Sequence, residues 1–335
     1  MKRLYYLFYI AAMTLVLASC EHKELCYHHP HTVSIRVEFD WRDAPQADPD
    51  GMCVYFYPLE GGSGQRFDFN NTTGGEVDLK VGKYRVICFN NDTEAVQFFN
   101  TDDFMTHGVF TREGNVLEPI YGNGANYAPR AADTEDERVV ICPDMMWGCT
   151  ATDVEITESG VSYVCVTPGE DDVKLSNDEL VITLFPHELV CTYTYEVRNV
   201  TNLKHMTQMC GSISGMSGVL TFSTEELDRE CVTLPFEAHA GDESTVVGKF
   251  YTFGHNLENP DPHKIVFYVV MDDGAKYCYK DSENLDVTEQ VHNAPDFRHV
   301  HLIIDGLNLP DPIENGHGFD PSVDDWEIVE DDIIL

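Results

Sequence analysis

Hydrophobic and polar residues alternate along much of the chain. In the first such run five apolar residues share one parity, with polar residues between them: Val33, Ile35, Val37, Phe39 and Trp41. Successive side chains of a strand point to opposite faces, so this alternation predicts a strand with one buried face. Similar runs, which we also expect to be strands, are 189–197, 246–253, 264–271 and 298–304.

Two local patterns complete the secondary-structure prediction. Residues 77–81 and 84–88 alternate on either side of Gly82 and Lys83, which predicts a hairpin that turns at these two residues. Helical periodicity is weak, so we expect only short helices, at 223–227 and 286–291, and irregular structure at 100–140. Half-buried strands with frequent turn residues predict an all-β fold of antiparallel sandwiches with few short helices.

Residues 1–20 have the pattern of a secretion signal that ends in a lipid-attachment site. Lys2 and Arg3 precede an apolar stretch at 4–17, which is shorter than the roughly 17–25 residues of a membrane-spanning helix. The stretch ends in Leu-Ala-Ser-Cys at 17–20, which resembles the lipobox of bacterial lipoproteins. We therefore expect residues 1–19 to be removed and Cys20 to carry the lipid. The alternative is an ordinary cleaved signal followed by an incidental cysteine.

The length of the mature chain predicts two domains. Removing residues 1–19 from 335 leaves 316 residues, more than a single hydrophobic core usually organises. The division that we expect is a tether at 20–32, an N-terminal β-sandwich at 33–185, a C-terminal β-sandwich at 186–310 and a tail at 311–335.

The charge of the chain excludes one class of partner. It carries 58 Asp and Glu residues against 21 Lys and Arg, a formal net charge of −37. Such a chain repels phosphate backbones, so we exclude nucleic acid as a partner. Anionic membrane surfaces repel it as well, so we expect the lipid to hold it at the membrane.

No motif in the sequence predicts an enzyme. His187-Glu188 begins like the zinc-protease helix motif, but the second histidine is missing and the segment lies on an expected strand. The segment 211–215 has no serine at its centre, so it is not a nucleophile elbow. Asp48, Asp50 and Gly51 lack the remaining ligand positions of a calcium loop.

One cluster near the lipid site contains metal-ligand residue types: His22, Cys26, His28, His29 and His31. A tether that leads into the first strand is the interpretation that we favour over a metal site. The sequence therefore predicts no catalytic residue, no metal site and no cofactor. The identity of any small-molecule ligand stays unknown at this point.

Several short motifs spread over the mature chain resemble the fimbrillins, which are lipoprotein precursors of type V pili in Gram-negative anaerobes. These motifs are the lipobox, Phe39-Asp40-Trp41 and the segments 211–216, 250–254, 286–291 and 318–326. The resemblance implies two transthyretin-like sandwiches in tandem and a lipid-anchored location in the outer membrane, exposed at the cell surface. It also implies assembly with other fimbrillin-like subunits by strand exchange.

The same resemblance suggests two segments for assembly. Fimbrillins are matured by cleavage after an arginine near the first strand, and Arg42 is the best positional match, ahead of Arg130 and Arg138. The tail contains residues suited to a donor strand that enters a neighbouring subunit: Trp326, Ile328, Val329, Ile333 and Ile334. The alternative is that the tail forms an edge strand of its own domain.

We therefore expect a lipid-anchored surface protein that is a pilus subunit or an accessory or tip adhesin and that assembles by β-strand addition. The alternative is a monomeric surface lipoprotein that binds glycan or another extracellular ligand. An exposed row of Trp or Tyr on one sheet face would favour this alternative.

Overall fold

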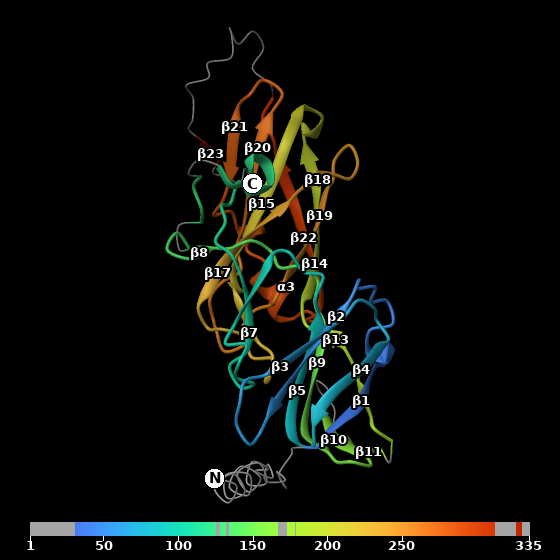
Figure 1. The fold of residues 1–335 in the computed structure, drawn as a ribbon. Helices are drawn as coiled ribbons and strands as arrows, with labels where there is room; N and C mark the ends of the chain where they lie inside the picture. The colour runs from blue at the N-terminus through green and yellow to red at the C-terminus, as the bar shows by residue number, and fades with distance from the viewer. Residues whose placement is uncertain are drawn as a thin grey trace, which may run out of the picture.

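The computed structural model describes residues 31–124, 128–131, 134–166, 173–177, 179–311 and 326–329. Within these residues nearly all regular structure is strand, which confirms the predicted all-β fold. Figure 1 shows two sandwiches stacked end to end, the N-terminal one mainly in blue and green and the C-terminal one mainly in yellow and red. No helix in this part of the chain is long and apolar enough to cross a membrane.

The N-terminal sandwich has a small and a large sheet. In the small sheet β1 (Thr32–Phe39) lies between β4 (Gly74–Lys80), to which it is antiparallel, and β12 (Val181–Leu184), to which it is parallel. The large sheet contains, in spatial order, β11 (Val173–Asn177), β10 (Val161–Val166), β9 (Trp147–Ile156), β5 (Gly82–Asn90), β2 (Met52–Pro58) and β3 (Gln65–Phe69), with β13 (His187–Glu188) paired to β9. Ile35 and Val37 of β1 share one buried core with Val54 and Phe56 of β2. Each such fully buried side chain contributes roughly 1.5–3 kcal/mol.

The predicted hairpin at Gly82 and Lys83 is wrong. The strands β4 and β5 exist, but β4 pairs with β1 whereas β5 pairs with β2 and β9. Between them the chain crosses from the small sheet to the large one. Val77 of β4 and Val86 of β5 therefore belong to the same core from opposite sheets. An alternating pattern is satisfied equally well by two strands that face each other across a core and by two strands that pair.

The C-terminal sandwich has the same construction. Its small sheet contains β18 (His239–Ala240), β19 (Val246–Thr252), β14 (Cys191–Thr201) and β22 (His299–Asn308). Its large sheet contains β23 (Glu327–Val329), β21 (Lys276–Tyr279), β20 (Ile265–Met271), β15 (Met206–Ser217), β17 (Cys231–Glu237) and β8 (Arg138–Val139). Tyr193 and Tyr195 of β14 pack with Phe236 and Phe267 in the core between these sheets.

The two sandwiches share one strand topology. The first strand of each, β1 or β14, lies between an antiparallel neighbour, β4 or β19, and the last strand of the small sheet, β12 or β22, to which it is parallel. The facing sheets also correspond, with the order β9-β5-β2-β3 in one and β21-β20-β15-β17 in the other. The chain is therefore built from two copies of one sandwich design.

Part of the region expected to be irregular at 100–140 connects the two sandwiches. A third sheet contains β6 (Val96–Phe99), β7 (Gly108–Thr111) and β16 (Val219–Thr221), so it combines strands from both halves. Further along, Val116 and Leu117 lie in a buried cluster with Cys210 and Tyr268 of the C-terminal sandwich. Figure 1 shows this segment running up beside the C-terminal sandwich to β8.

Helices are few and short, as expected. They are α2 (Glu118–Tyr121), α3 (Thr288–His292) and the 3-10 helices η1 (Trp41–Asp43), η2 (Gly122–Gly124), η3 (Leu203–His205) and η4 (Glu283–Leu285). The helix expected at 286–291 corresponds to α3, but the one expected at 223–227 does not form. Glu225 there has a left-handed backbone, with φ of 53°, which interrupts a right-handed helix.

Candidate assembly strand and junction cleft

β1 combines a central position in its sheet with a position at the start of the described part of the chain. Residues 32–38 pair with 80–74 of β4, and residues 36–39 pair with 181–184 of β12. Gly74 permits the close approach of β4, because a Cβ there would lie 2.0 Å from the carbonyl oxygen of Val37. A strand in this position can leave without dividing the remaining chain, and its departure would expose the backbone edges of both neighbours.

Arg42 follows β1 directly, within η1. Asp40 caps this short helix by accepting a hydrogen bond from the backbone N–H of Arg42, and its carboxylate also accepts one from the Arg42 guanidinium. The side-chain hydrogen bond from Arg42 lowers the pKa of Asp40. The guanidinium also lies 4.8 Å from the ring centroid of Phe185, yet the side chain is 64% exposed. Arg42 is therefore accessible at the end of the first strand.

The two other arginines considered from the sequence lie far from β1 along the chain. Arg130 donates to the backbone carbonyls of Glu135 and Glu137, and Arg138 forms an ion pair with Glu230 at 3.0 Å. Of the three arginines, only Arg42 directly follows the first strand. Its role as a maturation site stays a prediction.

The described part of the tail lies on its own C-terminal sandwich. β23 is the edge strand of the large sheet and runs parallel to β21, with Ile328 opposite Cys278. Trp326 is buried and packs edge-on against Tyr268, with ring centroids 5.5 Å apart. Ile328 is 45% exposed. Ile333 and Ile334 lie outside the described residues, so the donor-strand hypothesis stays a prediction.

The expected lipid-attachment residue and most of the first His and Cys cluster also lie outside the described residues. This applies to Cys20, His22, Cys26, His28 and His29. His31 is described and lies 3.1 Å from a carboxylate oxygen of Glu158, beside the start of β1.

A cleft of about 530 Å³ lies beside the junction of the two sandwiches. Glu225 and Arg298 line it, and the Glu225 carboxylate lies 2.7 Å from His187 Nε2 and 2.9 Å from Arg298. Burial alone would raise the pKa of Glu225, but the hydrogen bond with His187 and the charge of Arg298 hold it below its usual value. Phe297, which is 61% exposed, forms part of the rim.

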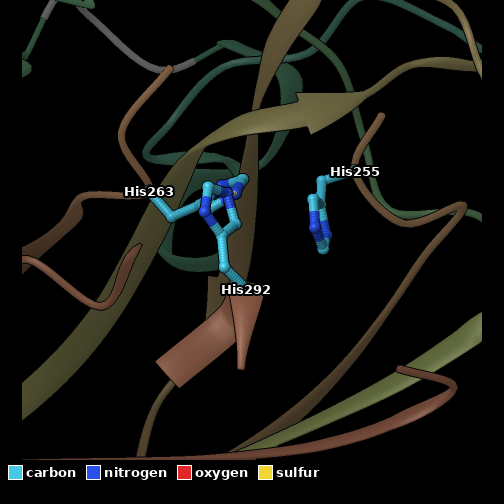
Figure 2. A group of neighbouring side chains, drawn as sticks. All are labelled: His255, His263 and His292. Atoms are coloured by element: carbon cyan, nitrogen blue, oxygen red, sulfur yellow. Dashed lines mark hydrogen bonds between the residues drawn. The ribbon is translucent and has the colours of Figure 1, made fainter. Parts of the chain in front are cut away.

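Three histidines that the sequence analysis left unassigned lie close together: His255, His263 and His292 (Figure 2). One ring nitrogen of each lies within 4.8 Å of the others. These residues are far apart in the sequence and form no motif of regular spacing. The only sequence signal was their residue type, which is too weak without the fold.

The fold and the strand arrangement define a class, the tandem β-sandwich proteins in which each sandwich begins with a central strand. Residues 19–237 match the family model described as Domain of unknown function (DUF5119), and the chain belongs to this family. It is 23% identical over 206 residues to a Bacteroides ovatus protein named as fimbrium anchoring subunit Fim4B, which covers 61% of this chain. The chain spans about half (51%) of the length of this curated relative.

Two solved structures extend the likeness. A Bacteroides ovatus protein described as an adhesin has a TM-score of 0.51 at 18% identity, with 90% of this chain and 93% of that chain covered. The fimbrial anchor protein Mfa2 of Porphyromonas gingivalis has a TM-score of 0.44 at 13% identity, with 82% and 91% covered. The similarity to the fimbrium anchoring subunit confirms the resemblance to fimbrial proteins expected from the sequence.

Proposed function

We propose that this protein is a lipid-anchored fimbrial subunit at the bacterial surface, which joins its neighbours by β-strand addition. The observation that carries the proposal is the position of β1, a central strand that is the first described strand and is followed by the exposed Arg42. The similarity to fimbrial and adhesin proteins supports the same class of function.

The physical basis of strand addition is the slot that β1 fills. Without β1, the edges of β4 and β12 would present unpaired backbone groups, and Leu79 and Ile182 would lose the apolar side chains packed on them. Such a slot is filled by a strand from another chain, with backbone hydrogen bonds providing affinity and alternate side chains providing specificity. The exposed Ile328 and the acidic tail around it form our candidate donor strand.

Lipid anchoring and removal of β1 exclude each other in a single copy. Cleavage after Arg42 would separate Cys20, with its lipid, from all residues that follow. A copy with this bond intact is anchored and keeps β1, whereas a cleaved copy has an open slot and can polymerise. The name of the relative Fim4B favours the intact, anchoring form for this chain.

The test is the N-terminus and lipid content of the protein on cells. We expect acylated Cys20 at the N-terminus of the membrane-bound form. A Cys20→Ala variant should lose fatty-acid labelling and appear in the medium, while Cys231→Ala, a control cysteine at the surface of the C-terminal sandwich, should stay bound. Fatty-acid labelling that persists in Cys20→Ala would contradict the lipid anchor. Absence of the protein from fimbrial preparations would contradict the fimbrial role.

The second candidate is a monomeric surface lipoprotein that binds a glycan or another extracellular ligand. The junction cleft with exposed Phe297 and the charged Arg298 favours it. The row of exposed Trp or Tyr that would favour it does not occur in the described residues, among which Tyr121 is the only exposed Trp or Tyr. A purified chain that stays monomeric on cells and binds glycan through this cleft would support this alternative.

A further inference from the structure

His255, His263 and His292 come from three separate segments of the C-terminal sandwich. His255 follows β19 in the connection to β20, His263 ends that connection just before β20, and His292 is the last residue of α3. The rings lie with centroids 5.0 to 5.1 Å apart. Figure 2 shows the rings of His263 and His292 in contact and the ring of His255 beside them. His263 is buried, His255 is nearly so, and His292 is exposed at the surface.

Hydrogen bonding fixes which nitrogen of His263 is available. Its Nδ1 lies 3.2 Å from the backbone carbonyl oxygen of Ser214, which can only accept, so Nδ1 carries the proton. The lone pair of the neutral ring is therefore on Nε2, which lies 3.1 Å from Nε2 of His292. In most metal-binding histidines one ring N–H likewise donates to a backbone carbonyl, a carboxylate or water, and the other nitrogen presents its lone pair to the metal.

The third ring supplies an independent observation. Nε2 of His255 is buried and has no hydrogen-bond partner among the described residues. A buried polar atom without a partner is costly, so such an atom usually has a ligand, an ion or a water molecule beside it.

The backbone is shaped to hold His263 in place. Gly215 has a left-handed backbone, with φ of +77°, and a Cβ there would lie 2.7 Å from Nδ1 of His263 and 2.8 Å from the carbonyl oxygen of Pro262. Only glycine fits this position without moving the ring. The β-bulge between Ile213 and Met216 of β15 brings this glycine to the site.

We propose that these three histidines bind a zinc ion, with the fourth position open to water or to a side chain of another protein. Neutral imidazoles suit Zn²⁺, whose bonds to nitrogen of about 2.0–2.1 Å place two ligand nitrogens of a tetrahedral site roughly 3.3 Å apart. The 3.1 Å between the two Nε2 atoms is close to this value. His255 would have to turn its ring inward, since the nitrogens span up to 4.8 Å. The ion would join the β19–β20 connection to α3.

The test uses the full mature chain, purified without a histidine tag, treated with chelator and titrated with Zn²⁺. We expect one equivalent to bind and to raise the melting temperature by several degrees. His292→Ala should weaken binding at least about 100-fold and abolish this shift, while circular dichroism shows an unchanged fold because the ring is exposed. His255→Gln, which keeps a polar side chain, is a second variant that should lose the same equivalent.

Two controls separate this site from other histidines and from thiols. His239→Ala changes an exposed histidine outside the group, and His28→Ala with His29→Ala removes part of the cluster behind the lipid. Both should retain the bound equivalent, and a Co²⁺-substituted chain should show no thiolate charge-transfer band. Absence of stoichiometric binding, or binding that survives in both His292→Ala and His255→Gln, would overturn the proposal.

Discussion

β1 and β14 are the same element of one sandwich design, yet they are held very differently. β1 pairs with β12 only over residues 36–39, whereas β14 pairs with β22 over residues 192–201, interrupted only at Asn199. β1 is the first described strand, whereas β14 has described strands before and after it in the chain. An identical position in a sheet therefore does not imply identical attachment. The difference supports the proposal that β1 can be replaced, whereas β14 stays in its sandwich.

The largest expected effect on stability comes from a charged residue placed at a buried position of each strand. Val37 of β1 and Val197 of β14 are both fully buried. Val197→Asp should destabilise the chain by about 4 kcal/mol or more, because the new carboxylate would be buried without a partner in a strand that stays in place. Val37→Asp should reduce the free energy of unfolding by less. We expect β1 to leave its slot while the rest of the chain stays folded, so that the new carboxylate reaches water.

Urea unfolding followed by circular dichroism measures this difference. The matched controls are Arg36→Gln and Arg198→Gln, which change exposed residues of the same two strands and should shift stability by no more than about 0.5 kcal/mol. Equal losses for the two aspartate variants would show that β1 is held as firmly as β14.

A smaller effect on stability is expected when the pH is lowered, because a histidine is buried at the junction that both sandwiches share. His107 lies among Tyr55, Phe89 and Phe222, and its Nδ1 is 2.6 Å from the Tyr57 hydroxyl. Burial lowers the pKa of His107 to about 4. Below about pH 6.5 this imidazole is protonated in the unfolded chain but stays neutral in the folded chain. The free energy of unfolding therefore falls as the pH drops from about 6.5 to 4, by up to about 3 kcal/mol.

Replacement of this histidine isolates its share of the pH dependence. His107→Phe should flatten the stability profile between pH 6.5 and 4, whereas His239→Ala, at an exposed position, should leave it unchanged. Thermal unfolding at a series of pH values measures both. A profile that is unaltered in His107→Phe would show that other groups cause the loss.

The smallest effect on the monomer is expected from the tail. Deleting residues 327–335 removes β23, of which Glu327 and Ile328 are exposed, and leaves Trp326 in place. The free energy of unfolding should fall by less than about 1 kcal/mol, while polymers disappear if the tail is the donor strand. A large fall in monomer stability would show that the fold needs the pairing of β23 with β21, which would contradict a donor role.

Sequence reasoning predicted the strands better than their partners. Alternation located β1 and β14 because one face of each is buried, but it could not tell that β4 and β5 lie in opposite sheets. The expected helix at 223–227 failed because Glu225 turns toward His187 and Arg298, which are distant in the sequence. The grouping of His255, His263 and His292 depends in the same way on the finished fold.

Native-state hydrogen exchange on the unmodified protein tests the replaceable-strand account most directly, since it measures both strands in one sample. We predict that the amides of residues 33–39 exchange together, through an opening that leaves the C-terminal sandwich intact. Their exchange should be at least about tenfold faster than that of residues 193–200, a difference of about 1.4 kcal/mol in opening free energy. Equal protection of the two strands, lost only on global unfolding, would contradict the account.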